Sequence, residues 1–171
     1  MAVLGEYYAK LQEGKMNNEY VKAFDKVIGH EGGYVDDPTD KGGETKYGIS
    51  KRAYPHLEIK SLTLDDARKI YFEDYWVKNR VEELPKDIQF CYFDMCVNMG
   101  GSRACKILQK TANAKGENLS VDGRIGKNTI KGSQKVELER LKAYRVLYYA
   151  NIVIKKPSQE KFWYGWFRRS I

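Results

Sequence analysis

The sequence predicts a mainly α fold with one turn-rich insertion. Apolar residues recur at helical spacing over most of the chain, which is the pattern of helices that bury one face. Residues 32–50 interrupt this pattern, because they hold five glycines and the turn-forming run 36–38. The composition, 42% hydrophobic and 13% aromatic, supplies enough apolar material for a core and excludes a disordered chain.

The first predicted helix begins at Asn17 or Asn18 as N-cap and ends at the glycine pair 32–33. Its apolar side chains recur at i, i+4, i+7 and i+8: Tyr20, Phe24, Val27 and Ile28. The glycine-rich segment that follows predicts turns and a short hairpin, with residues 34–35 and 45–47 as strand candidates.

A second helix is predicted from Thr63 to residue 79, because Asp66 occupies the capping-box position three residues after Thr63. A third follows Pro85 and ends at the glycine pair 100–101.

The remaining part of the chain also has helical spacing. Helices are predicted over residues 103–114, in a short stretch after Gly126, and over residues 134–154. The aromatic residues Phe162, Trp163, Trp166 and Phe167 have helical spacing and are expected to pack in the core, and stacking on sugar rings is the alternative.

The charge is divided unevenly along the chain. Thirty basic and 23 acidic residues give a net charge of +7 over 171 residues, a length of one domain or two small ones. Residues 1–100 carry 14 basic and 18 acidic side chains, a net of −4, whereas residues 101–171 carry 16 and 5, a net of +11. The second half is therefore expected to meet a polyanion, although a solvated helical face would give the same statistics.

Membrane insertion and signal-peptide export are not expected. The longest apolar run, residues 146–154, is far shorter than the roughly 20 apolar residues of a membrane-spanning helix. The N-terminus turns acidic at Glu6 before an apolar signal core can form.

The three cysteines are expected to be apolar core residues in a reducing compartment. Cys91 and Cys96 would point about 140° apart on one helix, so they cannot pair, and a bridge to Cys105 is the alternative. With only His30 and His56 besides them, no zinc-ligand spacing is present, and we expect no metal or cofactor.

Glu31 is the first candidate for chemistry. Its spacing continues the buried face of the first predicted helix, in the last turn, where desolvation and the helix dipole both raise the pKa of a carboxyl group. The alternative is a solvated Glu at a frayed helix end. Asp40 follows nine positions later and Thr45 five beyond it. A protonated carboxyl group with a second polar group opposite is the arrangement that cleaves glycosidic bonds.

Several separated motifs carry a resemblance to a known family. They are His30-Glu31-Gly32-Gly33-Tyr34, Asp37-Pro38, Asp40, Gly42-Gly43-x-Thr45-x-x-Gly48-Ile49, Tyr75-Trp76, Leu84-Pro85, Asp94 with Val97-Asn98-x-Gly100, and Leu108-Gln109. With these motifs the chain resembles glycoside hydrolase family 108, the phage-type N-acetylmuramidases. The resemblance implies a lysozyme-like α+β fold, in which a helical body and a small turn-rich β-hairpin lobe flank the active-site cleft.

The resemblance also implies roles for individual residues. Glu31 would be the general acid, and Asp40 and Thr45 would orient water or stabilise charge. Thr45 follows Asp40 by five positions, where the wider superfamily has six. The expected substrate-binding residues are Tyr34, Tyr47, Tyr75, Trp76, Asp94 and Asn98. For Asp94 and Asn98, an internal hydrogen-bonded pair is the alternative.

The resemblance further divides the chain into an N-terminal extension (1–16), a catalytic part (17–103) and a helical C-terminal part (104–171), packed into the same globular unit. The C-terminal part would bind peptidoglycan. Its stretch 121–126 resembles the Asp-Gly-x-Ile-Gly turn of peptidoglycan-binding modules, and a plain turn that caps the next helix fits equally well.

The expected function is an N-acetylmuramidase (lysozyme) activity on the β-1,4 bond between N-acetylmuramic acid and N-acetylglucosamine. The alternatives are a lytic transglycosylase and a non-catalytic basic protein that binds nucleic acid. We expect a monomer that is made in the cytoplasm and reaches peptidoglycan in the periplasm or cell wall through a holin or a secretion system. Its role would be cell lysis or wall remodelling for secretion, with no stable membrane insertion.

Overall fold

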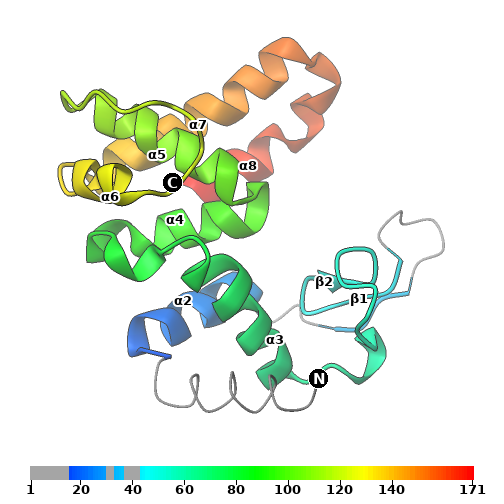
Figure 1. Cartoon of the computed structure of the whole chain (residues 1–171). Helices are drawn as coiled ribbons and strands as arrows, with labels where there is room; N and C mark the ends of the chain where they lie inside the picture. Colours follow the sequence, from blue (N-terminus) through cyan, green and yellow to red (C-terminus); the bar gives the residue numbers. More distant parts are fainter. Residues whose placement is uncertain (1–15, 30–32, 37–42) are drawn as a thin grey trace. The chain divides into compact units, whose positions relative to one another are not determined.

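The computed structural model of the chain describes residues 16–29, 33–36 and 43–171. The described part is mainly helical and contains a two-stranded antiparallel sheet, so the predicted fold class is confirmed (Figure 1). Contacts divide the chain into two compact units, Met1–Trp76 and Val77–Ile171. The predicted boundary between a catalytic part and a C-terminal part, at residues 103–104, stays a prediction.

The first unit contains helix α2, a hairpin and a broken second helix. The elements are α2 (Asn18–Ile28), β1 (Thr45–Lys46), β2 (Ile49–Ser50), η1 (Ile59–Ser61), α3 (Leu64–Tyr71) and η2 (Phe72–Val77), whose last residue opens the second unit. The predicted capping box of α3 is present, since Thr63 and Asp66 exchange hydrogen bonds. The hydrogen bonds from Thr63 lower the pKa of Asp66. Beyond Tyr71 the helix continues as a π-helix, which the spacing of apolar residues did not predict.

Helix α2 is shorter than predicted. Asn17 caps it as expected, accepting a hydrogen bond from the Tyr20 amide at 2.8 Å. The helix ends at Ile28, because Gly29 takes a φ of 58°, a conformation that favours glycine and stops the α-helical hydrogen bonds. The end at the glycine pair 32–33 was therefore a wrong prediction.

An aromatic core joins α2 to the second helix of this unit. The fully buried Tyr20 ring packs edge-on against Phe72 and Trp76, with centroids 4.8 and 5.3 Å away. Phe24 contacts Tyr71 in the same way at 5.6 Å. Edge-to-face aromatic pairs of this kind add stability beyond the area they bury.

The hairpin is closed by a two-residue turn. Thr45 pairs with Ser50 and Lys46 with Ile49, and the intervening Tyr47 and Gly48 both have positive φ, 51° and 73°. Positive φ at both central positions is the geometry of tight hairpin turns that match the strand twist. The sequence located the first strand but missed the second, because only two residues form each.

Gly48→Ala is expected to destabilise the first unit by about 1–3 kcal/mol, from left-handed strain and a close contact. A Cβ at residue 48 would lie 2.6 Å from the Tyr71 hydroxyl. Gly33→Ala is the matched control, since Gly33 lacks a positive φ and a Cβ there would meet no atom within 4 Å. Urea unfolding followed by circular dichroism compares the two, and equal midpoints would contradict the strain argument.

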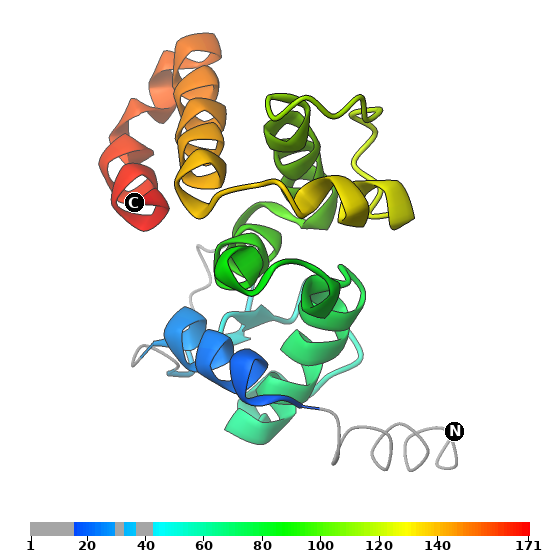
Figure 2. The ribbon, with the colours of Figure 1, turned by 90° about the vertical axis from the view of Figure 1, so that its left-hand side faces the viewer.

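The second unit is helical throughout. Its elements are η3 (Val81–Glu83), α4 (Lys86–Met99), α5 (Gly101–Asn113), α6 (Lys127–Ser133), α7 (Leu138–Lys155), η4 (Pro157–Phe162) and α8 (Trp163–Ser170). Helix α5 packs against α4, α6 and α7, and α8 lies along α7, as both ribbon views show (Figures 1 and 2). Gly100, at a φ of 85°, ends α4 and Gly126 caps α6, as predicted, whereas α7 begins at Leu138, after the predicted start at residue 134.

The cysteines are free and buried in this unit, as predicted. Burial raises the pKa of the Cys105 thiol to about 12, so it is not a thiolate near neutral pH.

The aromatic end does not pack in the core as predicted. Phe162 and Phe167 are exposed, whereas the half-buried Trp166 stacks on Tyr149 with centroids 4.9 Å apart. Helical spacing identified a helix here, but it could not show which of its rings the neighbouring helices would cover.

Candidate functional site

Two of the predicted catalytic residues, Glu31 and Asp40, lie outside the described residues. The helix-dipole argument for Glu31 required a place in the last turn of the first helix. Because α2 ends at Ile28, the described helix does not support that argument. The prediction that Glu31 is the general acid then depends on its sequence motif.

Thr45, the third predicted catalytic residue, is fixed by backbone pairing on both sides. Its amide and carbonyl exchange hydrogen bonds with Val35, both at 2.8 Å, while its Cα pairs with Ser50 in β2. Its hydroxyl donates to the Gly43 carbonyl at 3.3 Å, which leaves the oxygen lone pairs available as acceptors. The Thr45 hydroxyl oxygen can thus accept a hydrogen bond, and backbone pairing holds the residue in place. Thr45 follows Asp40 by five positions in the sequence.

The structure brings Tyr47 and Tyr75 together through Tyr71. The Tyr71 hydroxyl donates to the Tyr47 carbonyl at 3.1 Å, and the Tyr71 and Tyr75 ring centroids are 5.2 Å apart. Tyr34 precedes Val35, the residue that bridges to Thr45; it is exposed and donates its hydroxyl to Glu44 at 3.2 Å. Tyr47 and Tyr75 are therefore both linked to the buried Tyr71, whereas Tyr34 contacts Glu44.

Trp76 is a core residue, which corrects its prediction as a substrate-binding side chain. It is 1% exposed and packs against Tyr20. The adjacent Tyr75 is half-buried, and burial raises its pKa. A pattern of neighbouring aromatic residues could not show which of the two faces inward, because η2 follows π-helical rather than α-helical spacing.

A carboxylate and a phenol also meet in the first unit. Tyr54 donates its hydroxyl to Asp74 Oδ2 at 2.7 Å. Burial, followed by this hydrogen bond, raises the pKa of Tyr54, so the phenol stays protonated. Burial and the negative charge of Asp74 also raise the pKa of Glu73. The pair fixes the loop before α3 onto η2 and was not predicted from the sequence.

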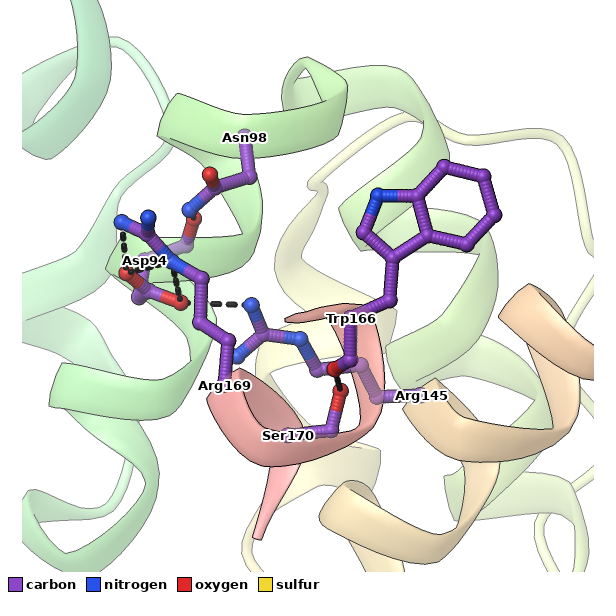
Figure 3. A network of polar contacts seen from close by, with 6 residues as sticks. All are labelled: Asp94, Asn98, Arg145, Trp166, Arg169 and Ser170. Atoms are coloured by element: carbon purple, nitrogen blue, oxygen red, sulfur yellow. Dashed lines mark hydrogen bonds and ion pairs between the residues drawn. The ribbon is translucent and has the colours of Figure 1, made fainter. Parts of the chain in front are cut away.

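Asp94 and Asn98 lie in α4, in the second unit, and Asp94 is engaged by two arginines (Figure 3). Arg145 Nη2 donates to Asp94 Oδ2 at 2.6 Å, and Arg169 Nη2 donates to Oδ1 at 2.8 Å. Asp94 is 4% exposed and Arg145 2%. Although burial opposes ionisation of Arg145, the neighbouring Asp94 charge raises the pKa of the guanidinium.

This network corrects the role expected of Asp94. Both carboxylate oxygens accept from arginine, so the side chain holds α7 and α8 against α4, and its burial leaves it out of reach of a sugar. Asn98 donates to the main-chain carbonyl of Asp94 at 2.6 Å, which matches the internal pair that was the alternative, with a backbone oxygen as acceptor. Asn98 is exposed, so its side chain remains accessible.

The turn at residues 121–126 is organised by Gln109, another residue of the sequence motifs. The Gln109 side chain is buried, donates to Asp122 Oδ1 at 2.8 Å and accepts from the Gly123 amide at 3.0 Å. Hydrogen bonds from the Arg124 amide and from Gln109 lower the pKa of Asp122. The motif therefore fixes the loop that leads into α6, whose N-cap is Gly126.

Sequence reasoning missed a groove between α5 and α7. Its lining includes cationic and aromatic side chains from both helices: Arg103, Lys106, Lys110, Tyr144, Tyr148 and Lys155. The spacing of the basic residues in α5, at i, i+3 and i+7, could have indicated this groove.

The described residues form neither a metal site nor a membrane-spanning helix. Across residues 16–29, 33–36 and 43–171, no cluster of three or more histidine, cysteine or acidic side chains is placed to hold a metal ion. In the same ranges, no helix has the length and apolar content needed to span a membrane.

Comparison with known proteins identifies both parts of the chain. The sequence profile of the glycosyl hydrolase 108 family matches residues 24–100, and that of a predicted peptidoglycan domain matches residues 103–171. No curated protein matches the sequence. Among solved structures, that of Brucella abortus SagA is similar, with a TM-score of 0.70 and 31% identity over 88% of each chain. The chain is therefore a glycoside hydrolase with a peptidoglycan-binding region, and it belongs to the glycosyl hydrolase 108 family.

Proposed function

We propose that the protein is an N-acetylmuramidase that hydrolyses the β-1,4 bond between N-acetylmuramic acid and N-acetylglucosamine. The observation that carries the proposal is the family match over residues 24–100, which includes Glu31, Asp40 and Thr45 within one short segment. The peptidoglycan match over residues 103–171 supports the same substrate.

In this mechanism, Glu31 donates its proton to the glycosidic oxygen as the bond to the anomeric carbon breaks. Asp40 stabilises the oxocarbenium ion or orients the water that attacks the anomeric carbon. The Thr45 hydroxyl donates to the Gly43 carbonyl, so its oxygen can accept a hydrogen bond from that water. The water supplies the new hydroxyl at the anomeric carbon, and its remaining proton restores the acid.

The products distinguish hydrolysis from the transglycosylase alternative. Purified sacculi digested by the wild-type protein are expected to release fragments with reducing N-acetylmuramic acid ends, because water is consumed. Mass spectrometry of borohydride-reduced products is the measurement, and a labelled-water digest should place one heavy oxygen at each new end. Fragments with 1,6-anhydro ends, without heavy oxygen, would assign the protein to the transglycosylases instead.

The setting of the reaction is part of the proposal. The enzyme acts on peptidoglycan of the periplasm or cell wall after release through a holin or a secretion system, in lysis or in wall remodelling for secretion. Its monomeric state is also proposed, and size-exclusion chromatography with light scattering measures it.

A further inference from the structure

The groove between α5 and α7 has a volume of about 450 Å³ and lies entirely within the second unit. Arg103, Lys106 and Lys110 line it from α5, and Lys155 lines it from α7. A second hollow shares Arg103 and Tyr148 with this groove and is also lined by Asn98, Trp166 and Arg169.

Helical spacing places the cations in one row. Arg103, Lys106 and Lys110 are i, i+3 and i+7 on α5, so they share one face of that helix. Like charges at this spacing repel one another and destabilise a helix. The repulsion within this row lowers the stability of the folded protein, and a bound anionic ligand would offset that loss.

The charge of the groove is not neutralised by the protein. Among the described residues, no acidic side chain forms an ion pair with these three cations or with Lys155. The groove lining contains no acidic residue.

Other lysines of the same unit are paired. Lys115 contacts Glu137, Lys135 contacts Glu117 at 2.6 Å, and Lys142 contacts Glu139 at 2.9 Å. These pairs use three of the five acidic residues that follow position 100. The four groove cations thus belong to the positive charge of this region that no ion pair among the described residues neutralises.

The groove also has apolar and aromatic surface. Ile107 is buried at its base, Leu147 is 53% exposed at its side, and the half-buried Tyr144 and Tyr148 present aromatic rings. A peptide with small aliphatic side chains and several carboxylates matches this combination of apolar and cationic contacts.

We propose that this groove binds the carboxylate-bearing peptide stems of peptidoglycan, and not its glycan strand. The inference rests on the proposed action on peptidoglycan. The sugars of the strand lose their free carboxylate where a stem is attached, so the negative charge is on the peptides. Lysine and arginine side chains in the groove pair with these carboxylates while the proposed catalytic residues act on the strand.

The test compares two triple variants of the full chain. Lys106→Gln, Lys110→Gln and Lys155→Gln remove three groove charges, and Lys115→Gln, Lys135→Gln and Lys142→Gln remove three paired charges elsewhere. Net charge changes equally in both. Thermal unfolding checks that both remain folded, as expected because exposed ion pairs contribute little to stability.

Binding is measured by cosedimentation with purified sacculi on ice, with the Glu31→Gln substitution present in every protein to limit digestion. The groove variant is expected to bind about tenfold more weakly than its parent, and the control variant about as tightly as the parent. The difference should shrink as salt rises, since exposed charges are screened over about 8 Å at physiological ionic strength.

Three further ligands identify the source of the negative charge. An amidase removes the stems and leaves a free carboxylate on each N-acetylmuramic acid, so the stripped strand keeps negative charge without peptides. Stripped sacculi should bind the parent as weakly as intact sacculi bind the groove variant. Double-stranded DNA and vesicles with one third anionic lipid should show weaker binding than intact sacculi at the same salt.

Equal losses in both triple variants, or full binding of the parent to stripped sacculi, would overturn the proposal. Tighter binding of DNA or vesicles, lost only in the groove variant, would assign the groove to those polyanions and would equally overturn it. Binding is scored without hydrolysis, so failure of the proposed reaction appears separately, as absence of digestion products with the wild-type protein.

Discussion

Glu31→Gln is expected to lower the rate of sacculus hydrolysis by about 10²- to 10⁴-fold, which is the usual contribution of a general acid. Glutamine has nearly the same shape as glutamic acid but cannot transfer a proton to the glycosidic oxygen. Binding to sacculi should stay within about twofold, because the change preserves size and removes at most one charge. Turbidity loss of sacculi measures the rate, and cosedimentation measures the binding.

Glu44→Gln is the matched control for this experiment. Glu44 lies in the same sequence segment, and its carboxylate accepts a hydrogen bond from Tyr34 on the exposed hairpin. It should retain most of the activity, because an amide oxygen accepts the same hydrogen bond. If Glu31→Gln hydrolyses sacculi as fast as Glu44→Gln, the proton donor is another residue and the mechanism is wrong.

Asp94→Asn is expected to destabilise the protein by about 3–5 kcal/mol, the usual effect of removing one partner from a buried ion pair. Arg145 is 2% exposed and would keep its charge without a counter-ion. Arg169 would lose the same carboxylate. Urea unfolding of the second unit, followed by circular dichroism at 222 nm, is the measurement.

Two comparisons separate charge from general disruption at this site. Glu139→Gln removes an exposed ion pair with Lys142 and should cost less than about 1 kcal/mol. Adding Arg145→Met to Asp94→Asn should restore part of the lost stability, because the uncompensated buried charge is removed. Without recovery in the double variant, the destabilisation would have to come from packing instead.

The Asp94 network also joins the two profile matches physically. Asp94 lies within residues 24–100, and both arginines lie within residues 103–171. Helix α4 belongs to the same compact unit as α5 to α8. A fragment cut at the profile boundary would therefore leave the buried Asp94 without either partner.

Local rules predicted most of the helices and several of their ends. The Asn17 cap, the capping box at Thr63 and Asp66, and the glycine after α4 are all present, because each depends on residues close in sequence. The end of α2 was wrong because Gly29, inside an apolar periodic stretch, takes a positive φ. The π-helical continuation after Tyr71 leaves no mark in the spacing of apolar residues.

The site could be predicted only in part. The sequence motifs predicted Glu31, Asp40 and Thr45 as catalytic residues, and the structure shows the backbone of Thr45 paired in the hairpin. Sequence spacing placed Asp94 among substrate contacts, since it could not show two arginines arriving from 51 and 75 residues away. Similarly, it gave a net charge of +11 after residue 100 but not its distribution.

By itself, the sequence determined the helical fold, the turn-rich hairpin, the glycoside hydrolase motifs and the separation of charge between the two halves. These depend on periodicity, capping and composition, which are encoded within a few neighbouring residues. Only the tertiary structure decided that Trp76 and Asp94 are internal, that the aromatic end is largely exposed, and which lysines keep an unpaired charge. Burial and ion pairing depend on which helix faces meet, and that is set by contacts between residues far apart in the chain.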